Sequence, residues 1–524
     1  NDMAAIVTDQ FRILNANNFV ETVDNSANSY YVVLGLANPT LSVGFGRTSD
    51  WNTKLPNPVD NFNYINHTGD TQIFGKKVTG ANVRRLITRR NWTQGTRYEM
   101  YRHDYSAEYP SPISNSTRLY DASYYVMNKN FDVYVCIDNG SSGINVNGNA
   151  SQDEPLFTDL EPSRAGESGD GYIWKYLFTV PPSDIIKFDS TEYISVPGNW
   201  STSSETQIQS VRENGDSTIN NNQIKKVYID QQGFGYSQNI VGREVDIIGD
   251  GTGAKVVIDT DSNGKIVNTV ISSGGQGYTY GLVDLGPMGS SGVSIGNKAK
   301  LIPIIPPSKG HGFDLYKELG TDKLLVYARF DDSTKDFPTD TKFAQISIIK
   351  NPTSIGSTAT YTANEFSSVN AIKIVSPTGT PAIGEKIEQT VTGGTALGYI
   401  VSYDTDTNVI KYYQDRSLYF SGNNIGDQTD YAGITTEAKV LPFESSAEPI
   451  NAAGGFQASV DQSFTGISTN PSGNKVVSLG VNFTNGLASP EINKGSGDVI
   501  YLDNRPLITR NSRQKEDIKI ILEF

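Results

Sequence analysis

The chain has 524 residues and a formal net charge of −14, and it contains a single cysteine, Cys136. This length has room for roughly two to four domains with sizeable cores. An acidic surface repels phosphate backbones and anionic lipids, so we expect no nucleic acid and no membrane among its partners. One cysteine excludes an internal disulfide. Because Cys136 lies in a strand-like run, we expect a buried, inert thiol.

Composition favours an all-β protein with many turns. The chain has 50 glycines and 28 tyrosines, and only 19% of its residues are charged. Glycine, asparagine and serine supply turns, tyrosine suits strands, and long helix formers are few. No apolar run approaches the ~20 residues of a membrane span. No basic segment followed by an apolar one opens the sequence, so we expect no signal peptide.

The first elements in chain order are a helix and a strand. Residues 9–22 place apolar side chains at helical spacing, which predicts a helix with one apolar face. The side chains are Ala16, Phe19 and Val20, with Val23 just beyond. A strand is expected at 30–36, and a second short helix at 81–89.

The second helix leads into a stretch, 89–98, that is rich in arginine and aromatic side chains. Arg89, Arg90 and Arg97 stand here with Trp92. Such a combination resembles a nucleic-acid patch, but the negative net charge argues against that interpretation. We interpret these four residues as candidates for a protein interface, since arginine and tryptophan dominate interface energies. The alternative is that they brace their own loop.

The most regular strand pattern spans 172–180. Its residues alternate strictly, and one face consists of Tyr172, Trp174, Tyr176, Phe178 and Val180. Period-two alternation is the signature of a strand, and the prolines at 181–182 end it. We interpret it as a core strand, because a monomer rarely leaves such a face open to water. The alternative is an exposed platform that stacks bases or sugars. Further strands are expected at 131–138 and 192–196.

A polar run at 201–222 predicts a linker. After it the sequence changes character. The pattern of 229–236, ending in Gly-Phe-Gly-Tyr, returns at 271–278, ending in Gly-Gln-Gly-Tyr. Each copy is followed by a glycine-rich turn and a strand. Two copies predict a small all-β domain inserted at 222–308, rather than a solenoid.

The rest of the chain returns to strands. They are expected at 313–329 and 343–350. Short strands between glycine and asparagine turns over 361–443 predict a small barrel, and 445–474 has the composition of a flexible arm. The last residues, 517–524, alternate and predict a strand tied into a sheet.

No pattern of catalytic or metal-binding residues stands out. The three histidines are His67, His103 and His311, and no His-x-x-x-His or Cys-x-x-Cys spacing exists. No Gly-x-Ser-x-Gly elbow marks a nucleophile. We therefore predict no catalytic, cofactor-binding or metal-binding residues, no cofactor and no enzyme activity.

Seven short blocks, spread from end to end, share one resemblance. They are IVTDQFRILNANNF at 6–19, GFGRTSDW at 44–51, RRNWTQGTRY at 89–98, GDGYIWKYLFTVPP at 169–182, EYISVP at 192–197, QISIIKNP at 345–352 and GDVIYLDNRP at 497–506. In this order they resemble the baseplate wedge protein family of T4-like contractile-tailed phages, the product of gene 8. The closing residues 516–524 also fit. Asn504 and Arg505, in the last block, join the interface candidates.

The resemblance implies a mainly β fold, with a β-sandwich core, a few helices in its loops, and a homodimer. Two stretches, 222–308 and 357–490, lie outside the blocks, so we expect two inserted small all-β domains there. The second is expected to be barrel-like and to include the arm. The core then consists of 1–221, 309–356 and 491–524, three pieces that build one sandwich.

The family is structural and has no catalytic residues to carry over. The resemblance therefore implies a baseplate wedge subunit that links neighbouring wedge proteins during assembly and during rearrangement on infection. Its partners are then itself and other wedge proteins, and its place is the virion tail, after synthesis in the bacterial host cytoplasm. The alternative is a glycan-binding tail-fibre adhesin, with glycan contact through 222–308. A polysaccharide-degrading enzyme has the least support, because it needs more than two repeats.

Overall fold

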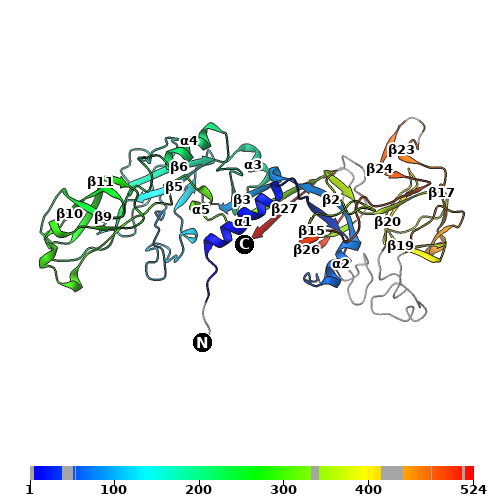
Figure 1. Cartoon of the computed structure of the whole chain (residues 1–524), viewed down its shortest axis with the longest axis horizontal. Helices are drawn as coiled ribbons and strands as arrows, with labels where there is room; N and C mark the ends of the chain where they lie inside the picture. The colour runs from blue at the N-terminus through cyan, green and yellow to red at the C-terminus, as the bar shows by residue number, and fades with distance from the viewer. Residues whose placement is uncertain are drawn as a thin grey trace. The chain divides into compact units, whose positions relative to one another are not determined.

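The computed structural model describes residues 5–37, 51–53, 55–331, 342–414, 441–471, 473, 475–509 and 514–524. The protein is mainly β, with several sheets and few helices, as the sequence predicts. Its chain, coloured along its length in Figure 1, divides into two compact units. Unit 1 comprises Asn1–Asn18, Arg84–Leu325 and Ile521–Phe524, and unit 2 comprises Phe19–Val83 and Val326–Ile520. Of the block at 44–51, only Trp51 lies within the described residues.

The described α-helices are short, apart from the first. They are α1 (Asp9–Asp24), α2 (Phe62–Thr71), α3 (Pro182–Lys187), α4 (Thr206–Gly215) and α5 (Leu315–Leu319). α1 confirms the expected N-terminal helix, and it buries Ile13, Ala16, Val20 and Val23 at helical spacing.

Several sequence predictions are wrong at the level of single elements. The expected helix at 81–89 is strand β3 (Val83–Thr88), which pairs antiparallel with β7 (Tyr193–Val196). Pairing and burial with a strand outweigh helix formation, because so short a helix has little stability of its own. The polar run at 201–222 is more than a linker, since it contains α4. Ile208 and Val211, three residues apart, give that helix a buried face.

Unit 1 contains the three-stranded sheet β4-β5-β6, made by β4 (Tyr125–Met127), β5 (Asp132–Asn139) and β6 (Tyr172–Thr179). β5 and β6 are antiparallel, with Asp132 opposite Thr179, and register shifts interrupt their ladder twice. A further sheet of the chain, which does not belong to unit 1 alone, has the order β27-β14-β3-β7, with β14 (Lys323–Phe330) and β27 (Glu516–Glu523). The strand expected at 313–329 therefore begins only at Lys323, after α5.

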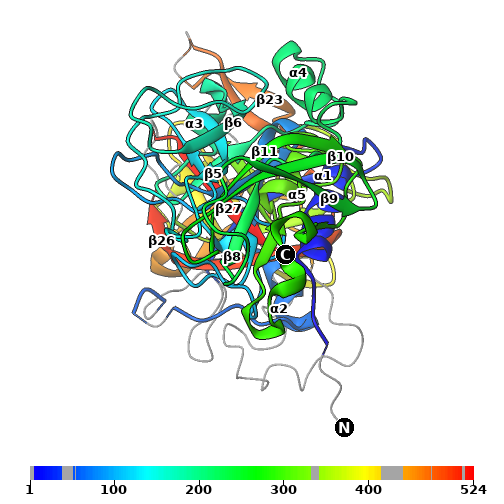
Figure 2. The same cartoon turned by 90° about the vertical axis from the view of Figure 1, so that its left-hand side faces the viewer.

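The residues at 222–308 form two sheets over a hydrophobic cluster of their own, which runs from Ile224 to Ile305. One sheet has the order β11-β10-β9-β12, and the other pairs β13 with β8. Figure 2 labels β9, β10 and β11 of the first sheet. The strands are β8 (Val227–Gln231), β9 (Arg243–Gly249), β10 (Thr252–Thr260), β11 (Ile266–Gln276), β12 (Gly281–Val283) and β13 (Lys300–Pro303). We call this part of unit 1 the insertion.

The tyrosines of the duplicated glycine–tyrosine motif connect the two copies through hydrogen bonds to the backbone. Both tyrosines are buried, and each binds the backbone of the strand that follows the other copy. The Tyr236 hydroxyl accepts from Ala299 N (2.8 Å). The Tyr278 hydroxyl accepts from Ala254 N (3.1 Å) and donates to Ile247 O (3.0 Å). The two copies are therefore cross-linked to one another by their own tyrosines.

Unit 2 contains a five-stranded sheet and a closed barrel. The sheet has the order β16-β2-β1-β15-β26, from β1 (Tyr30–Gly35), β2 (Gln72–Val78), β15 (Lys342–Lys350), β16 (Glu365–Ser367) and β26 (Asp498–Thr509). The barrel runs β20-β19-β18-β21-β22-β17 and closes where β17 pairs with β20. Its strands are β17 (Asn370–Thr378), β18 (Lys386–Val391), β19 (Gly394–Asp404), β20 (Val409–Tyr413), β21 (Ile450–Ala452) and β22 (Gln457–Val460).

The remaining described strands of unit 2 adjoin the barrel in sequence. β25 (Leu487–Ala488) extends the barrel sheet beside β17. β23 (Gly466–Thr469) and β24 (Val477–Phe483) form a two-stranded sheet. The stretch at 445–474, expected as a flexible arm, thus supplies β21, β22 and β23.

The three core pieces expected in one sandwich contribute to three different sheets. β6 belongs to β4-β5-β6, β15 to the five-stranded sheet and β27 to β27-β14-β3-β7. The single sandwich built from these three pieces therefore stays a prediction. The hydrophobic cluster around β6 is completed by loops and by α4, through Tyr98, Tyr101, Trp200 and Ile208.

We expect Tyr278→Phe to lower the free energy of unfolding by about 1–3 kcal/mol, because it leaves the buried Ala254 N and Ile247 O without their shared partner. Urea denaturation followed by circular dichroism measures the change. Tyr280→Phe is the matched control, because Tyr280 is 64% exposed. Equal stability of the two variants would contradict a stabilising role of the Tyr278 hydroxyl.

Candidate functional site

The arginine-rich loop at 89–98 is fastened to unit 1 at both ends. Trp92 N donates to Met127 O of β4 (2.8 Å), and Met127 N donates to Arg90 O (2.7 Å). At the other end, Tyr98 N donates to the Tyr172 hydroxyl of β6 (2.8 Å). The buried sheet therefore sets the position of the candidate interface residues.

Arg89 and Arg90 are engaged within the chain. Arg89 Nη1 donates to Ser190 O (3.0 Å). Arg90 Nη2 donates to both carbonyl oxygens of 120–121, each at 3.3 Å, and its guanidinium lies 4.6 Å from the ring centroid of Tyr125. These contacts brace the loop, and they leave Arg90 little freedom to reach a partner.

Trp92 and Arg97 occupy different environments. Trp92 is partly buried against the unit 1 core, and its Nε1 donates to Ser151 Oγ (3.0 Å). Arg97 is exposed, and within the described part of the chain its side chain makes no hydrogen bond or ion pair. Arg97 is therefore the arginine of this loop whose side chain is directed to solvent.

Asn504 and Arg505 lie in unit 2, on β26. Asn504 is buried and connects β26 with two other segments. Its side-chain amide nitrogen donates to Pro56 O (2.9 Å), and its side-chain oxygen accepts from Gln345 Nε2 (2.8 Å). Arg505 is exposed and its Nε lies 2.5 Å from Asp503 Oδ2. These contacts of Asn504 and Arg505 are made with residues of unit 2.

The aromatic face of β6 is a core face. Tyr172, Trp174, Tyr176 and Phe178 are at most 2% exposed, and the rings of Tyr172 and Trp174 stack at 5.3 Å. Such burial leaves no platform for a base or a sugar. The aromatic residues instead support the loop at 89–98 through Tyr98, whose ring packs edge-on against Trp174.

The opposite face of β6 holds a buried lysine that sequence reasoning missed. Lys175 Nζ donates to Leu160 O (2.5 Å) and to Asn214 Oδ1 (2.7 Å). Burial and then the neighbouring Lys225 lower the pKa of Lys175 to about 8. In the sequence, burial of Lys175 was indicated only by its position between Ile173 and Leu177 in an alternating strand.

A shallow groove of about 700 Å³ lies beside Trp92. Its apolar lining comes from Trp92, Leu156, Phe157 and Ala165. Its polar lining comes from Gln94, Lys129, Gln152, Asp153 and Glu154. We call this the Trp92 groove. Its size is within the range of sites that hold a ligand or the side chains of a partner.

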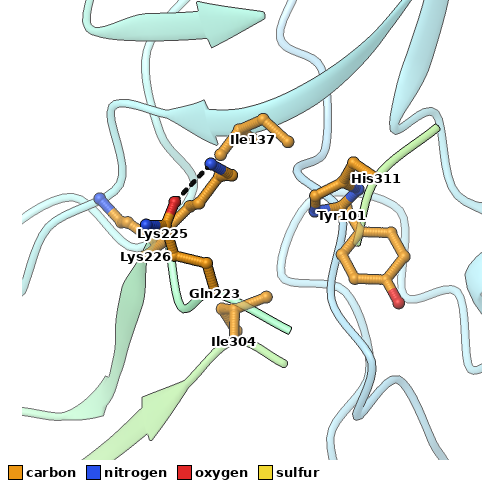
Figure 3. A pocket seen from close by; sticks show the side chains of 7 residues that line it. All are labelled: Tyr101, Ile137, Gln223, Lys225, Lys226, Ile304 and His311. Atoms are coloured by element: carbon orange, nitrogen blue, oxygen red, sulfur yellow. Dashed lines mark hydrogen bonds between the residues drawn. The ribbon is translucent and has the colours of Figure 1, made fainter. Parts of the chain in front are cut away.

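A second, buried cavity lies where the insertion meets the rest of unit 1 (Figure 3). It measures about 10 Å³, which is room for one water molecule. Lys225 Nζ donates to Gln223 Oε1 (2.7 Å), as the dashed line in Figure 3 shows, and the His311 ring meets Tyr101 edge-on at 4.8 Å. The neighbouring Lys226 is held by Asp138 at 2.7 Å. The ammonium groups of the two lysines that line the cavity, Lys225 and Lys226, are thus bonded to other side chains of the protein.

Polar contacts fix the insertion next to this cavity. The Arg102 guanidinium is bonded twice by Asp104, at 2.9 and 2.8 Å, and lies 4.1 Å from the ring centroid of Tyr228 on β8. Ile305 N donates to His103 Nδ1 (3.1 Å). Because that nitrogen accepts a hydrogen bond, His103 is neutral in this arrangement.

Cys136 and His67 are the remaining candidate groups of the sequence. Cys136 is buried, which raises the pKa of its thiol well above the ordinary value. Among the residues that the structure describes, no group of three His, Cys, Asp or Glu side chains could hold a metal ion. The helices within the described ranges include none with the length and hydropathy of a membrane span. The His67 side chain lies outside the described part.

Residues 152–230, from the edge of the Trp92 groove through β6 to β8, match the family model Phage-Gp8, described as Bacteriophage T4, Gp8. A curated relative is the baseplate wedge protein gp8 of Enterobacteria phage T4. It is 25% identical over 217 residues, which cover 37% of this chain and 60% of the relative. The chain therefore matches about 60% of the length of that relative. Both findings confirm the resemblance that the ordered blocks indicate.

Acidification is expected to loosen the insertion. Desolvation by the surrounding chain lowers the pKa of His103, and full burial lowers that of His311, below the ordinary value of 6.5. The unfolded chain then binds more protons than the folded one as the pH falls below that value, so stability is lost on acidification and retained above pH 6.5. We expect the Ile305 amide to exchange faster at pH 5.5 than at 7.5, after correction for intrinsic rates.

Hydrogen–deuterium exchange with mass spectrometry measures this at the peptide that contains Ile305. In the matched variant His103→Asn, a neutral acceptor replaces the imidazole, so we expect most of the pH dependence at Ile305 to disappear. Protection that is the same at both pH values in the unsubstituted chain would contradict the assignment.

Proposed function

We propose that this protein is a structural subunit of the baseplate of a contractile phage tail. The family match over 152–230 carries the proposal, because it coincides with β6 and the elements that pack on it. The curated relative bears the name baseplate wedge protein. In this role the chain links neighbouring wedge proteins, resides in the virion tail after synthesis in the host cytoplasm, and performs no catalysis.

The contacts of unit 1 suit a part that moves as a rigid body. The insertion is fixed by the Lys226–Asp138 ion pair and by Arg102 between Asp104 and Tyr228. Rearrangement of an assembly through rotation of rigid parts needs such internal fixation. We therefore propose that unit 1 keeps its insertion in place while its outer surfaces exchange partners.

Arg97 is the best-placed interface residue of the loop at 89–98. It is exposed, whereas Arg89 and Arg90 bind carbonyl oxygens of the chain itself. Trp92 offers part of its ring to the Trp92 groove while Ser151 holds its Nε1. We propose that contacts with other wedge proteins, or with a second copy in a homodimer, use Arg97 and Trp92.

A glycan-binding tail-fibre adhesin remains the second candidate. Tyr236 and Tyr278 are buried and cannot stack on a sugar, but Phe234 and Tyr280 beside them are 50% and 64% exposed. A glycan array with the full chain tests this function. Binding that is lost on Tyr280→Ala would favour it, and an array without binding would remove it.

Electron microscopy of assembled tails, with this subunit tagged, tests the main proposal. We expect the tag at the baseplate. A location on fibres, or absence from tails, would contradict the proposed function.

We expect Arg97→Ala to weaken assembly about tenfold, because an exposed interface arginine is removed, while thermal stability stays unchanged. Sedimentation of the variant with its purified wedge partners measures assembly. Arg243→Ala, at an exposed arginine on the insertion, is the control and should assemble normally. Arg90→Ala should lower stability instead, because Arg90 braces its loop. Normal assembly of the Arg97 variant would remove that residue from the interface.

A further inference from the structure

The Trp92 groove combines an apolar floor with a negative rim. Leu156 in its lining is 48% exposed, which is high for a leucine in a folded protein. Trp92 cannot swing freely, since Ser151 Oγ accepts its Nε1 at 3.0 Å. A rigid aromatic ring beside an exposed aliphatic side chain is the arrangement that anchors a partner side chain at low entropic cost.

The lining of the groove carries more acidic than basic side chains. Its carboxylates are those of Asp153 and Glu154. Lys129 is the cation of the lining, and it is already paired with Glu154 at 3.2 Å. Ser168 donates to Asp153, and this hydrogen bond lowers the pKa of that carboxyl, so it is ionised at neutral pH. The rim therefore favours a cation next to the apolar floor.

We propose that the Trp92 groove docks an extended segment of a neighbouring protein in the assembly, one that carries an apolar side chain beside a lysine or arginine. The apolar side chain lies on Trp92 and Leu156, and the cation faces Asp153 and Glu154. The inference rests on the proposed function, since it requires a protein neighbour. It adds a place on the surface and the chemistry of the segment that binds there.

Photocrosslinking in assembled tails tests the docking. A p-benzoylphenylalanine replaces Leu156 in the chain as it is incorporated during infection, and cross-linked peptides are identified by mass spectrometry. Leu14, at 52% exposure on α1, is the matched control position. We expect the probe at Leu156 to capture a segment of another tail protein with a lysine or arginine within about three residues of the cross-link.

Three results would overturn the inference: incorporation into tails without a cross-link at Leu156, a captured segment without a basic residue, or capture of a glycan. Absence of the protein from tails would instead overturn the proposed function, and the inference with it. The two failures are therefore distinguishable.

Tryptophan fluorescence tests the same chemistry with the free chain. Trp51, Trp174 and Trp200 are at most 1% exposed, so acrylamide quenching reports mainly on Trp92. The probe is a blocked heptapeptide with a central phenylalanine flanked by two lysines. We expect it to protect Trp92 from quenching, and its glutamate counterpart to have no effect.

Two variants separate the apolar and the ionic contributions. Leu156→Ser should weaken the peptide about fivefold, because half of a leucine side chain no longer packs on it. Glu154→Gln should weaken it about two- to fivefold, as expected for a partly exposed charge. Leu14→Ser is the control and should leave binding unchanged. Equal protection by the lysine and glutamate peptides would overturn the inference.

Discussion

Burial of strand β6 on both faces determines where the other parts of unit 1 lie. On one face, the Tyr172 hydroxyl accepts from Tyr98 N and donates to Asn149 O, so two loops are fixed by one side chain. On the other face, Lys175 binds Leu160 O and Asn214 of α4. A strand with one face open to water could not hold loops in this way. The Trp92 groove exists because the loops around it are carried by a buried strand.

The insertion is attached by buried charges rather than by apolar contact alone. Lys226 pairs with Asp138, and Arg102 lies between a carboxylate and the ring of Tyr228. Buried charges cost desolvation, so each is tolerated only where its partner has the right geometry. This requirement selects one docked orientation. The segment 222–308, which has a hydrophobic cluster of its own, is thereby held against the rest of unit 1.

Residue type alone could not rank the interface candidates. Arg90 and Arg97 look equivalent in the sequence, but Arg90 lies over Tyr125 and binds two carbonyl oxygens, whereas Arg97 points to solvent. Asn504 was also an interface candidate by residue type, but its side-chain amide donates to Pro56 O inside unit 2. A polar side chain becomes an interface residue only where the fold leaves it without an internal partner. That depends on neighbours distant in the sequence.

The sequence alone determined the local features: the mainly β composition, the alternation of β6, α1, the duplication of the insertion and the barrel strands β17 to β20. These follow from side-chain periodicity and turn residues, which act within a few positions. Only the tertiary structure decided that 81–89 pairs with β7 as a strand, that Lys175 is buried, and that the duplicated tyrosines bind each other's strands. Each of these outcomes depends on a contact with a chain segment far away, and no local pattern encodes which segment that is.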